Sequence, residues 1–575
     1  MKIKWFEKTK ILTVIQLVLI LSWLTNLQDS EAYFFVNGLM AMAGVFCLLE
    51  NDRKGMKMPA SWKVWTGILA AVFSAAAVLA NYFLFEPISA LFNLMNLTLS
   101  LLGGWVIGFH ILEYFGGMSP ASEKGSEGTG KHPGKIFLMS FLSVAVIDLM
   151  YLFFASYPGI MTSDSVNQVR QIYTGSYDNW HPYWHTAVIR VFLLTGNRIF
   201  GSYQAGVAVF SVFQVCFLSA AISYAVTTMY QRGLPVRYLW LVWGFYALLP
   251  YHIAYSVTMW KDIFFAISCL VMITALYRLL SKMDKTAKID GLVFFLASIC
   301  FCIWRSNGLP AFAMLFVAFM LFFRRQRKIL AAMGVALILG YLLTGPVLSA
   351  LGVRGGNYVE MLSVPLQQVA RVIHDGKTLT AEEQLLVEAI ASEQDIREAY
   401  QPELSDPVKA FLWDPEGGRT VRENSGVYLR LWANLGMRYP AEYIKAWIDQ
   451  TKGYWSGGYQ YWVLADGIFP NELGICAEPG GNIIAKLFAA YFRYFEMIPF
   501  LHPLISIGLN AWIVILCGYV SLRKKRQEWL LTIPILAVLA SLIVSTPVYS
   551  EFRYIYSMFL SLPLILTATF LKTKE

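Results

Sequence analysis

The chain contains repeated apolar runs, and this feature limits its fold more than any other. Fourteen runs are long enough, or nearly so, to cross a hydrocarbon core of about 30 Å at a helical rise of about 1.5 Å per residue. They lie near residues 11–27, 33–49, 64–83, 88–112, 135–156, 203–229, 238–257, 262–280, 289–304, 308–323, 329–350, 499–521, 529–547 and 552–571. With 57% hydrophobic and only 14% charged residues, the chain is too apolar for a soluble domain. We therefore predict an all-α polytopic membrane protein with about fourteen transmembrane helices.

The basic residues predict how these helices are oriented. Short loops rich in Lys and Arg stay on the cytoplasmic side of a membrane. Such loops are MKIKWFEKTK, NDRKGMKMPASWK, the 116–135 segment, QRGLPVR, YRLLSKMDKTAK, RRQRK, RKKRQ and the tail KTKE. With fourteen spans all of them fall on one side, provided that residues 185–200 lie in the interface without crossing it. The expected location is a bacterial plasma membrane, with both termini in the cytoplasm.

Polar segments divide the chain into five parts. A Gly/Ser-rich stretch has the composition of a flexible linker, and a later polar region starts a helix with a capping box of Thr380 and Glu383. The parts are a four-helix membrane module (1–115), a cytoplasmic linker (116–134), a membrane core with an external loop at 157–202 (135–350), an extracytoplasmic region of mixed structure (351–498) and a three-helix membrane segment (499–575).

Polar side chains gather at the edges of the apolar runs, on the side opposite to the basic loops. One stretch is YPGIMTSDSVNQV, which places Asp164 a few residues after an apolar run; the others are HPYWH, MWKD, WRSNG, VPLQQVARV and SEFRY. Charges at the edge of hydrocarbon are costly and are usually paired or functional. The candidate site residues are Asp164, Gln168, His181, Lys261, Asp262, Arg305, Asn307, Arg371, Glu551, Arg553 and Tyr554.

Most of these residues also have a purely structural interpretation. Asp164 could cap the helix that SDSVNQVRQIY begins. Lys261 could extend its side chain to the membrane interface, and Asp262 could cap the helix that follows it. His181, and Arg305 with Asn307, could belong to tight turns. Glu551 and Arg553 could form a local ion pair, and Arg371 could have a structural role. Their convergence on one face of the membrane favours the functional interpretation.

The residue types indicate a phosphorylated ligand. Arginine binds phosphate in a bidentate manner, and lysine acts as a point charge. A carboxylate opposite these cations can deprotonate an attacking hydroxyl, and a phosphate leaving group that cations stabilise needs little else. Because the residues lie at a membrane surface, we expect the phosphate to belong to a lipid. This set predicts transfer of a sugar from a lipid-linked donor to an acceptor hydroxyl.

An apolar span, an external loop with an early aspartate, the motif HPYWHTAVIRVFLL and an interfacial helix together resemble the GT-C membrane glycosyltransferases. The resemblance covers roughly residues 135–350, and 499–571 are compatible with it. It implies a loop carboxylate that acts as base or binds metal, juxtamembrane helices, and a polyprenyl-phosphate sugar as donor. Asp164 matches that carboxylate, and the motifs MWKD, WRSNG, PLQQVARV and EFRY are similar to those of a poorly characterised bacterial branch.

The chain departs from the family pattern at the carboxylate. Many relatives have a paired acidic motif where this chain has Asp164 followed by Ser165, and the WWDYG-type motif is absent. Asp178 could supply a second carboxylate. No cofactor is expected, no metal ligand is assigned, and a divalent cation stays open. The seven cysteines have no metal-ligand spacing.

The predicted activity is an inverting transfer to a cell-envelope acceptor, which would be a glycan, lipid or protein, and no nucleic-acid partner is expected. Asp164 is the catalytic residue; Lys261, Arg305, Arg553, Arg371 and His181 bind substrate; Asp262, Asn307, Glu551, Gln168 and Tyr554 support them. Aromatic residues such as Trp180 and Trp455 could stack on sugars, although interfacial belts explain most of them. The alternatives are a polysaccharide polymerase or ligase, which relies on arginines and a histidine, and a lipid or glycan transporter, for which Asp148 would be the one deep acid.

Overall fold

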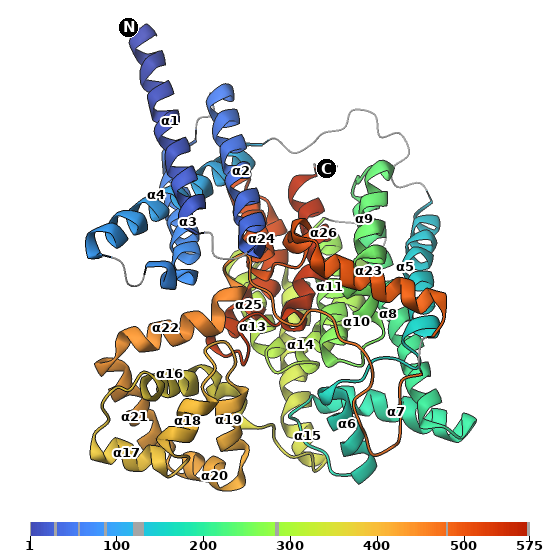
Figure 1. Cartoon of the computed structure of the whole chain (residues 1–575). Helices are drawn as coiled ribbons and strands as arrows, with labels where there is room; N and C mark the ends of the chain where they lie inside the picture. The colour runs from blue at the N-terminus through green and yellow to red at the C-terminus, as the bar shows by residue number, and fades with distance from the viewer. Residues whose placement is uncertain are drawn as a thin grey trace.

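The computed structural model describes residues 2–27, 31–55, 58–85, 89–118, 132–281, 287–478 and 481–571. Within these ranges the chain is helical and forms no strand, and extended segments meet only in isolated bridges. Figure 1 shows a helical group at the N-terminus, a central bundle of long helices and a further group of short helices. Most of the predicted linker, residues 119–131, and the tail 572–575 lie outside the described residues.

The N-terminal helices pack around the fourth of them. They are α1 (Lys2–Asn26), α2 (Glu31–Lys54), α3 (Ala60–Ala80) and α4 (Ala90–Gly117), with the short η1 (Tyr82–Phe85) after α3. Helix α4 contacts the other three, and Gly103 lets it approach α1, because a Cβ there would lie 2.2 Å from the carbonyl oxygen of Leu19. This group therefore has an apolar core of its own, around Trp23 and Ile107.

The central bundle follows, and α11 is the most buried of its candidate membrane spans. Its elements are α5 (Pro133–Ala155), α6 (Ser163–Thr174), α7 (Tyr183–Phe200), α8 (Tyr203–Gln231), α9 (Val236–Leu248), α10 (Pro250–Ser256), α11 (Lys261–Leu280), α12 (Ala287–Ile303), α13 (Gly308–Phe322), α14 (Arg327–Thr344) and α15 (Pro346–Ala350). Helix α11 carries no charged residue between its first and last turns, which suits a position between α8, α12 and α26.

Nine helices in the described part of the chain are long and apolar enough to cross a membrane. They correspond to nine of the fourteen predicted runs, and Ile11–Asn26, Gly308–Phe322 and Ile507–Arg523 are shorter apolar helices. The run at 238–257 is divided between α9 and α10 at Pro250, because proline lacks the N–H that a continuous helix needs. Residues 289–304 lie mainly in α12, which has 17 residues. The chain is thus an all-α membrane protein.

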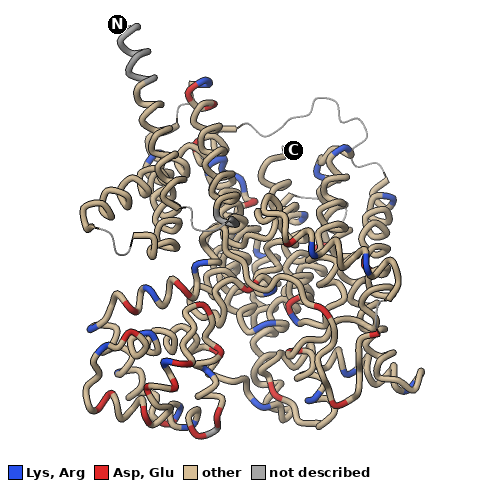
Figure 2. The backbone as a smooth tube through the Cα atoms, in the orientation of Figure 1, with Lys and Arg blue, Asp and Glu red and all other residues tan. Residues whose placement is uncertain are grey.

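The short helices between 358 and 454 form a compact polar unit. They are η3 (Tyr358–Leu362), α16 (Ser363–His374), α17 (Ala381–Glu388), α18 (Glu393–Ala399), α19 (Asp406–Trp413), α20 (Pro415–Glu423), α21 (Ser425–Arg438), α22 (Pro440–Thr451) and η4 (Lys452–Tyr454). The unit has small apolar cores of its own and is dense in charged residues (Figure 2). The predicted capping box of Thr380 and Glu383 is confirmed. The helix that it opens ends at Glu388, and Ser392 caps the next helix, α18.

Residues 455–478 follow this unit as an irregular segment, which we call the strap. It leads to α23 (Ile483–Met497), η5 (Pro499–Leu504), α24 (Ile507–Arg523), η6 (Gln527–Thr532), α25 (Ile533–Val544), η7 (Phe552–Ile555) and α26 (Tyr556–Phe570). The described part of 351–498 is therefore helical and irregular, and it contains no strand.

Figure 2 shows basic residues at the upper ends of α2, α5 and α9, whereas α6 and α7 lie at the lower end of the bundle.

Candidate functional site

Asp164 lies in the first turn of α6, and its carboxylate points away from the helix backbone. The N-cap position belongs to Thr162, which makes no side-chain cap hydrogen bond. The Thr162 hydroxyl instead accepts a hydrogen bond of 2.7 Å from the indole of Trp260. Asp164 is therefore not the N-cap residue, and its position near the helix N-terminus still favours a negative charge.

The chain between α5 and α6 fixes where this turn sits. The backbone N–H of Ile160 donates to the carbonyl of Val257 at 2.9 Å, and Met259 N–H donates back to Ile160 at the same distance. On the other side, Met161 N–H donates to Gly467 of the strap at 3.1 Å. The start of α6 is thus held between the segment before α11 and the strap.

Gln214 of α8 holds the segment that leads into α11. Its fully buried amide nitrogen lies 2.8–3.1 Å from the carbonyl oxygens of Tyr255, Ser256 and Thr258. The Tyr255 and Thr258 carbonyls also accept backbone N–H groups. Because buried carbonyls gain from hydrogen-bond donors, the added contact with Gln214 stabilises the non-helical turn between α10 and α11. The turn places Lys261 at the first position of α11.

Two cations meet the Asp164 carboxylate. Lys261 Nζ lies 2.7 Å and Arg553 Nη1 lies 3.0 Å from the same oxygen, Oδ2. His181 Nδ1 is 3.3 Å from Lys261 Nζ and 3.8 Å from Asp164 Oδ2. The side chain of Asp164 remains 18% exposed, so a ligand can reach this contact.

A second ion pair lies beside the first. Arg305 Nη1 is 2.6 Å from Oδ1 of the fully buried Asp262, in contact but without hydrogen-bond alignment. The Lys261 ammonium lies 4.0 Å from Oδ2 of Asp262. Glu551 Oε1 is 3.4 Å from Arg553 Nε. The carboxylates and cations therefore form one continuous cluster at a single end of the bundle.

Aromatic rings hold the two arginines. The guanidinium carbon of Arg553 lies 4.9 Å from the Trp260 ring centroid and 5.2 Å from that of Tyr554. Arg305 lies 4.8 Å from the Tyr554 ring and donates a 3.0 Å hydrogen bond to the Tyr554 carbonyl. Such contacts favour planar guanidinium groups over lysine. Both arginines thus contact the ring of one tyrosine.

Burial and charge set the protonation states of the groups outside the spans. Burial would raise the pKa of Asp164, but Arg553 and Lys261 outweigh it and hold that pKa well below its usual range. Burial, aided by Lys261, lowers the pKa of His181 to about 4. Burial raises the pKa of Glu551 to about 7, against the attraction of Arg553. Below pH 7 the cluster thus holds three cations and two carboxylates, with a net charge of +1.

The donor set does not fit a divalent cation. The Asp164 carboxylate is paired with Lys261 and Arg553, and Asp262 with Arg305. No three His, Cys, Asp or Glu side chains in the described ranges form a group that could hold a metal ion. The net positive charge suits an anion, and partly buried guanidinium and ammonium groups suit a phosphate.

The structure brings eight of the predicted residues together and places the other three elsewhere. Arg371 of α16 pairs with Asp449 at 2.6 Å and contacts the Tyr82 hydroxyl of η1, so it joins the polar unit to the N-terminal helices. Gln168 donates to Thr186 of α7 at 2.9 Å. Asn307 donates to Ser541 of α25 at 3.1 Å. The cluster contains Asp164, His181, Lys261, Asp262, Arg305, Glu551, Arg553 and Tyr554.

Sequence reasoning missed two residues that build the cluster. Trp260 stands in the motif MWKD, and its ring supports Arg553 while its indole N–H fixes Thr162. A tryptophan beside a lysine and an aspartate could have been recognised as a cation support. Gln214 is a fully buried amide inside a long apolar run, and such a residue signals a backbone irregularity nearby. Trp455 stacks on Trp447 away from the cluster.

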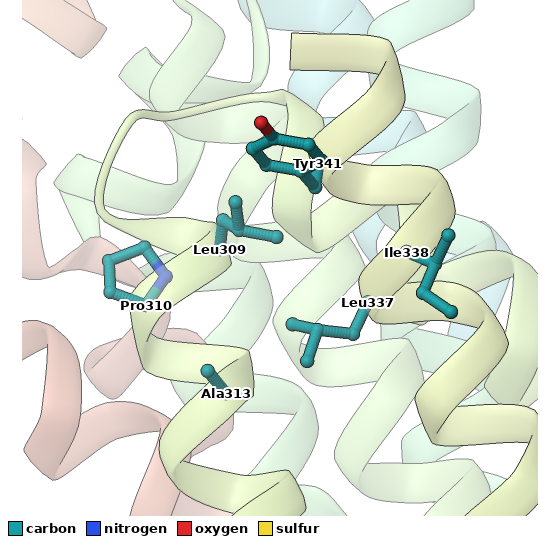
Figure 3. A pocket seen from close by; sticks show the side chains of 6 residues that line it. All are labelled: Leu309, Pro310, Ala313, Leu337, Ile338 and Tyr341. Atoms are coloured by element: carbon teal, nitrogen blue, oxygen red, sulfur yellow. The ribbon is translucent and has the colours of Figure 1, made fainter. Parts of the chain in front are cut away.

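An apolar cavity between α13 and α14 is a separate feature. Its lining consists of Leu309, Pro310, Ala313, Leu337, Ile338 and Tyr341 (Figure 3). It presents no cation and no carboxylate. This cavity therefore offers nothing to the phosphate chemistry that the ion-pair cluster supports.

Fold and cluster together define an all-α membrane protein with charged side chains gathered at one end of its bundle. The chain belongs to DUF6020, a family of unknown function, which matches residues 174–575. The match includes His181, Lys261, Arg305 and Arg553 and begins after Asp164. No curated protein and no solved structure matches the chain.

Proposed function

We propose that the protein is a glycosyltransferase of the GT-C type, which moves a sugar from a polyprenyl-phosphate donor to a hydroxyl of a cell-envelope acceptor. The observation that carries the proposal is the contact of Asp164 with both Lys261 and Arg553. The carboxylate is the base, and the cations bind the donor phosphate. We propose that the reaction takes place at the extracytoplasmic face of a bacterial plasma membrane, because the basic loops lie at the other end of the helices and such loops stay in the cytoplasm. The bundle would contain about fourteen spans.

In the proposed step, the acceptor hydroxyl attacks the anomeric carbon of the donor sugar. Asp164 takes the hydroxyl proton as the new carbon–oxygen bond forms, and the bond between the anomeric carbon and the phosphate oxygen breaks. The polyprenyl phosphate leaves with the electron pair, and Lys261, Arg305 and Arg553 stabilise its negative charge. One displacement inverts the anomeric configuration.

Donor binding also prepares the base. In the free protein the two cations keep the pKa of Asp164 too low for efficient proton abstraction. A donor phosphate competes for Lys261 and Arg553 and weakens their hold on Asp164. The pKa of the carboxyl then rises toward its ordinary value, so the base becomes effective when the donor is in place.

His181 supports a second candidate activity, a polysaccharide polymerase or ligase. Its pKa of about 4 leaves the imidazole uncharged at neutral pH. Its Nδ1 lies 3.3 Å from Lys261, within reach of the same ligand. In this version His181 is the base and Asp164 only positions the cations.

The test compares envelope glycans of a strain that lacks the gene with strains that carry wild type, Asp164→Asn or His181→Gln. The proposal expects wild type to restore a missing glycan or glycan modification and Asp164→Asn to fail. Restoration by Asp164→Asn together with failure of His181→Gln would favour the polymerase or ligase. Identical glycans in all strains would count against an enzyme and favour a transporter.

A further inference from the structure

A pair of exposed tryptophans lies next to the ion-pair cluster. Trp180, in the loop between α6 and α7, is 39% exposed, and Trp413, at the end of α19, is 38% exposed. Their ring centroids are 6.0 Å apart with the planes tilted at 50°. Large apolar rings that stay exposed on a protein surface mark binding sites when they are grouped.

The pair is continuous with the proposed base. The Trp180 ring stacks on the His181 ring, with centroids 5.8 Å apart and planes within 5°. The His181 ring nitrogen in turn lies 3.8 Å from the Asp164 carboxylate. A molecule that covers the tryptophans can therefore extend a hydroxyl to Asp164.

The loop that carries Trp180 is held rigidly. The backbone N–H of Trp180 donates a hydrogen bond to Asp178 Oδ1 at 3.0 Å, and the side-chain amide of Gln171 donates to the same oxygen at 3.1 Å. The Asn179 N–H donates to the Arg354 carbonyl at 2.9 Å. Asp178 is thus a turn residue, and the ring is presented in a fixed position before any ligand arrives. A preformed surface loses little entropy on binding.

The surroundings of Trp413 are charged, and the residue belongs to α19 of the polar unit. Lys409 Nζ lies 5.4 Å from the Trp413 ring centroid. The same ammonium pairs with Glu360 at 2.7 Å and with Asp406 at 2.8 Å, and the Asp406 side chain is 44% exposed. Trp413 thus lies beside an ion-pair network of the polar unit.

We propose that Trp180 and Trp413 form the acceptor site and that the acceptor is an oligosaccharide. Pyranose rings have an apolar C–H face that covers an indole and a polar rim that stays hydrated, which suits two half-exposed rings. Because the two tryptophans come from the membrane core and from the polar unit, one oligosaccharide spans both. This inference rests on the proposed function, since it takes Asp164 as the end point of the acceptor.

The test measures binding without transfer. Purified full-length protein in lipid nanodiscs is titrated with tetramers of β-1,4-linked glucose, α-1,4-linked glucose and β-1,4-linked N-acetylglucosamine. Calorimetry gives the Kd, and saturation-transfer NMR shows which sugar protons contact the protein. We expect saturable binding of at least one tetramer, a Kd at least tenfold weaker in Trp180→Ala and in Trp413→Ala, and partial recovery in the phenylalanine variants.

Trp65→Ala is the matched control, because Trp65 is 64% exposed on α3 and its loss should leave the Kd unchanged. Each variant is compared with wild type by thermal melting, and Trp413→Phe serves if Trp413→Ala unfolds. Binding by none of the tetramers, or an unchanged Kd in both tryptophan variants, overturns the inference. If the tryptophan variants weaken binding while the wild type transfers no sugar, the acceptor site stands and the proposed function fails.

Discussion

The Asp164 carboxylate lies 2.7 Å from Lys261 Nζ, although 97 residues separate them. Arg553 Nη1 approaches the same carboxylate oxygen from 389 residues away. Three distant parts of the chain therefore converge on one oxygen atom. Contacts of this kind hold charges in fixed positions before a ligand binds, which is what electrostatic stabilisation of a leaving phosphate requires.

Replacement of Arg553 by lysine should weaken donor binding more than it slows transfer. Lysine keeps the charge but loses the planar contact with Trp260 and Tyr554 and the bidentate geometry toward phosphate. We expect the KM for a polyprenyl-phosphate sugar to rise roughly tenfold, equivalent to about 1.4 kcal/mol, with a smaller change in kcat.

Arg371→Lys is the control for that experiment. Arg371 pairs with Asp449 in a different part of the molecule, so the donor KM should stay at the wild-type value while the melting temperature falls. If both variants changed the donor KM equally, the assignment of Arg553 to the phosphate would be wrong.

Donor affinity should fall as pH rises through about 7. Glu551 has a pKa raised to about 7, so below this pH it is neutral and the cluster carries a net charge of +1. Above it, Glu551 becomes a carboxylate and the net charge falls to zero. A phosphodiester keeps one negative charge throughout, so its Kd should rise by up to roughly tenfold between pH 6 and pH 8.

Glu551→Gln removes this titration. The variant should bind the donor with a Kd that is nearly constant over the same pH range and close to the wild-type value at pH 6. The same shift makes wild-type stability fall between pH 4.5 and about 7, because the unfolded carboxyl loses its proton first. A wild-type pH profile in Glu551→Gln would assign the pH dependence to another group.

Gln214→Leu should destabilise the fold and disturb the cluster indirectly. The substitution leaves the carbonyls of Tyr255, Ser256 and Thr258 without their shared donor. We expect a loss of about 2–3 kcal/mol. A thiol-reactive dye in a thermal ramp reports the loss as a lower melting temperature, because the buried Cys269, Cys302 and Cys517 react only when the protein unfolds. Gln384→Leu is the control, because Gln384 is exposed on α17. Equal melting temperatures for the two variants would show that Gln214 does not stabilise the turn before α11.

The convergence of the cluster could be predicted from the sequence because membrane topology is a strong constraint. Once the basic loops are placed on one side, Asp164, Lys261, Arg305 and Arg553 must all lie at the other end of their helices. Each sits within a few residues of an apolar run, so little freedom remains. The same reasoning failed for Arg371, which lies in the polar unit, where no membrane plane limits its position and its partner Asp449 is 78 residues away.

The number and form of the helices were harder to predict. Hydropathy treats 238–257 as one run, whereas Pro250 divides it, and the proline itself was the available signal. Similarly, Ser392 begins a second helix in a stretch with continuous helical propensity. The pairing of Trp180 with Trp413 depends on how the polar unit docks on the core. Docking of this kind is set by side-chain packing and leaves no periodic pattern in the sequence.

The central claim is that Asp164 is the base and the cations around it bind the donor phosphate. The most direct test measures donor binding and single-turnover sugar transfer in parallel, for purified wild type and Asp164→Asn with a polyprenyl-phosphate sugar. We predict that Asp164→Asn binds the donor at least as tightly as wild type, because a competing carboxylate is gone, and transfers its sugar about 10²–10⁴-fold more slowly. Transfer by Asp164→Asn at the wild-type rate would contradict it.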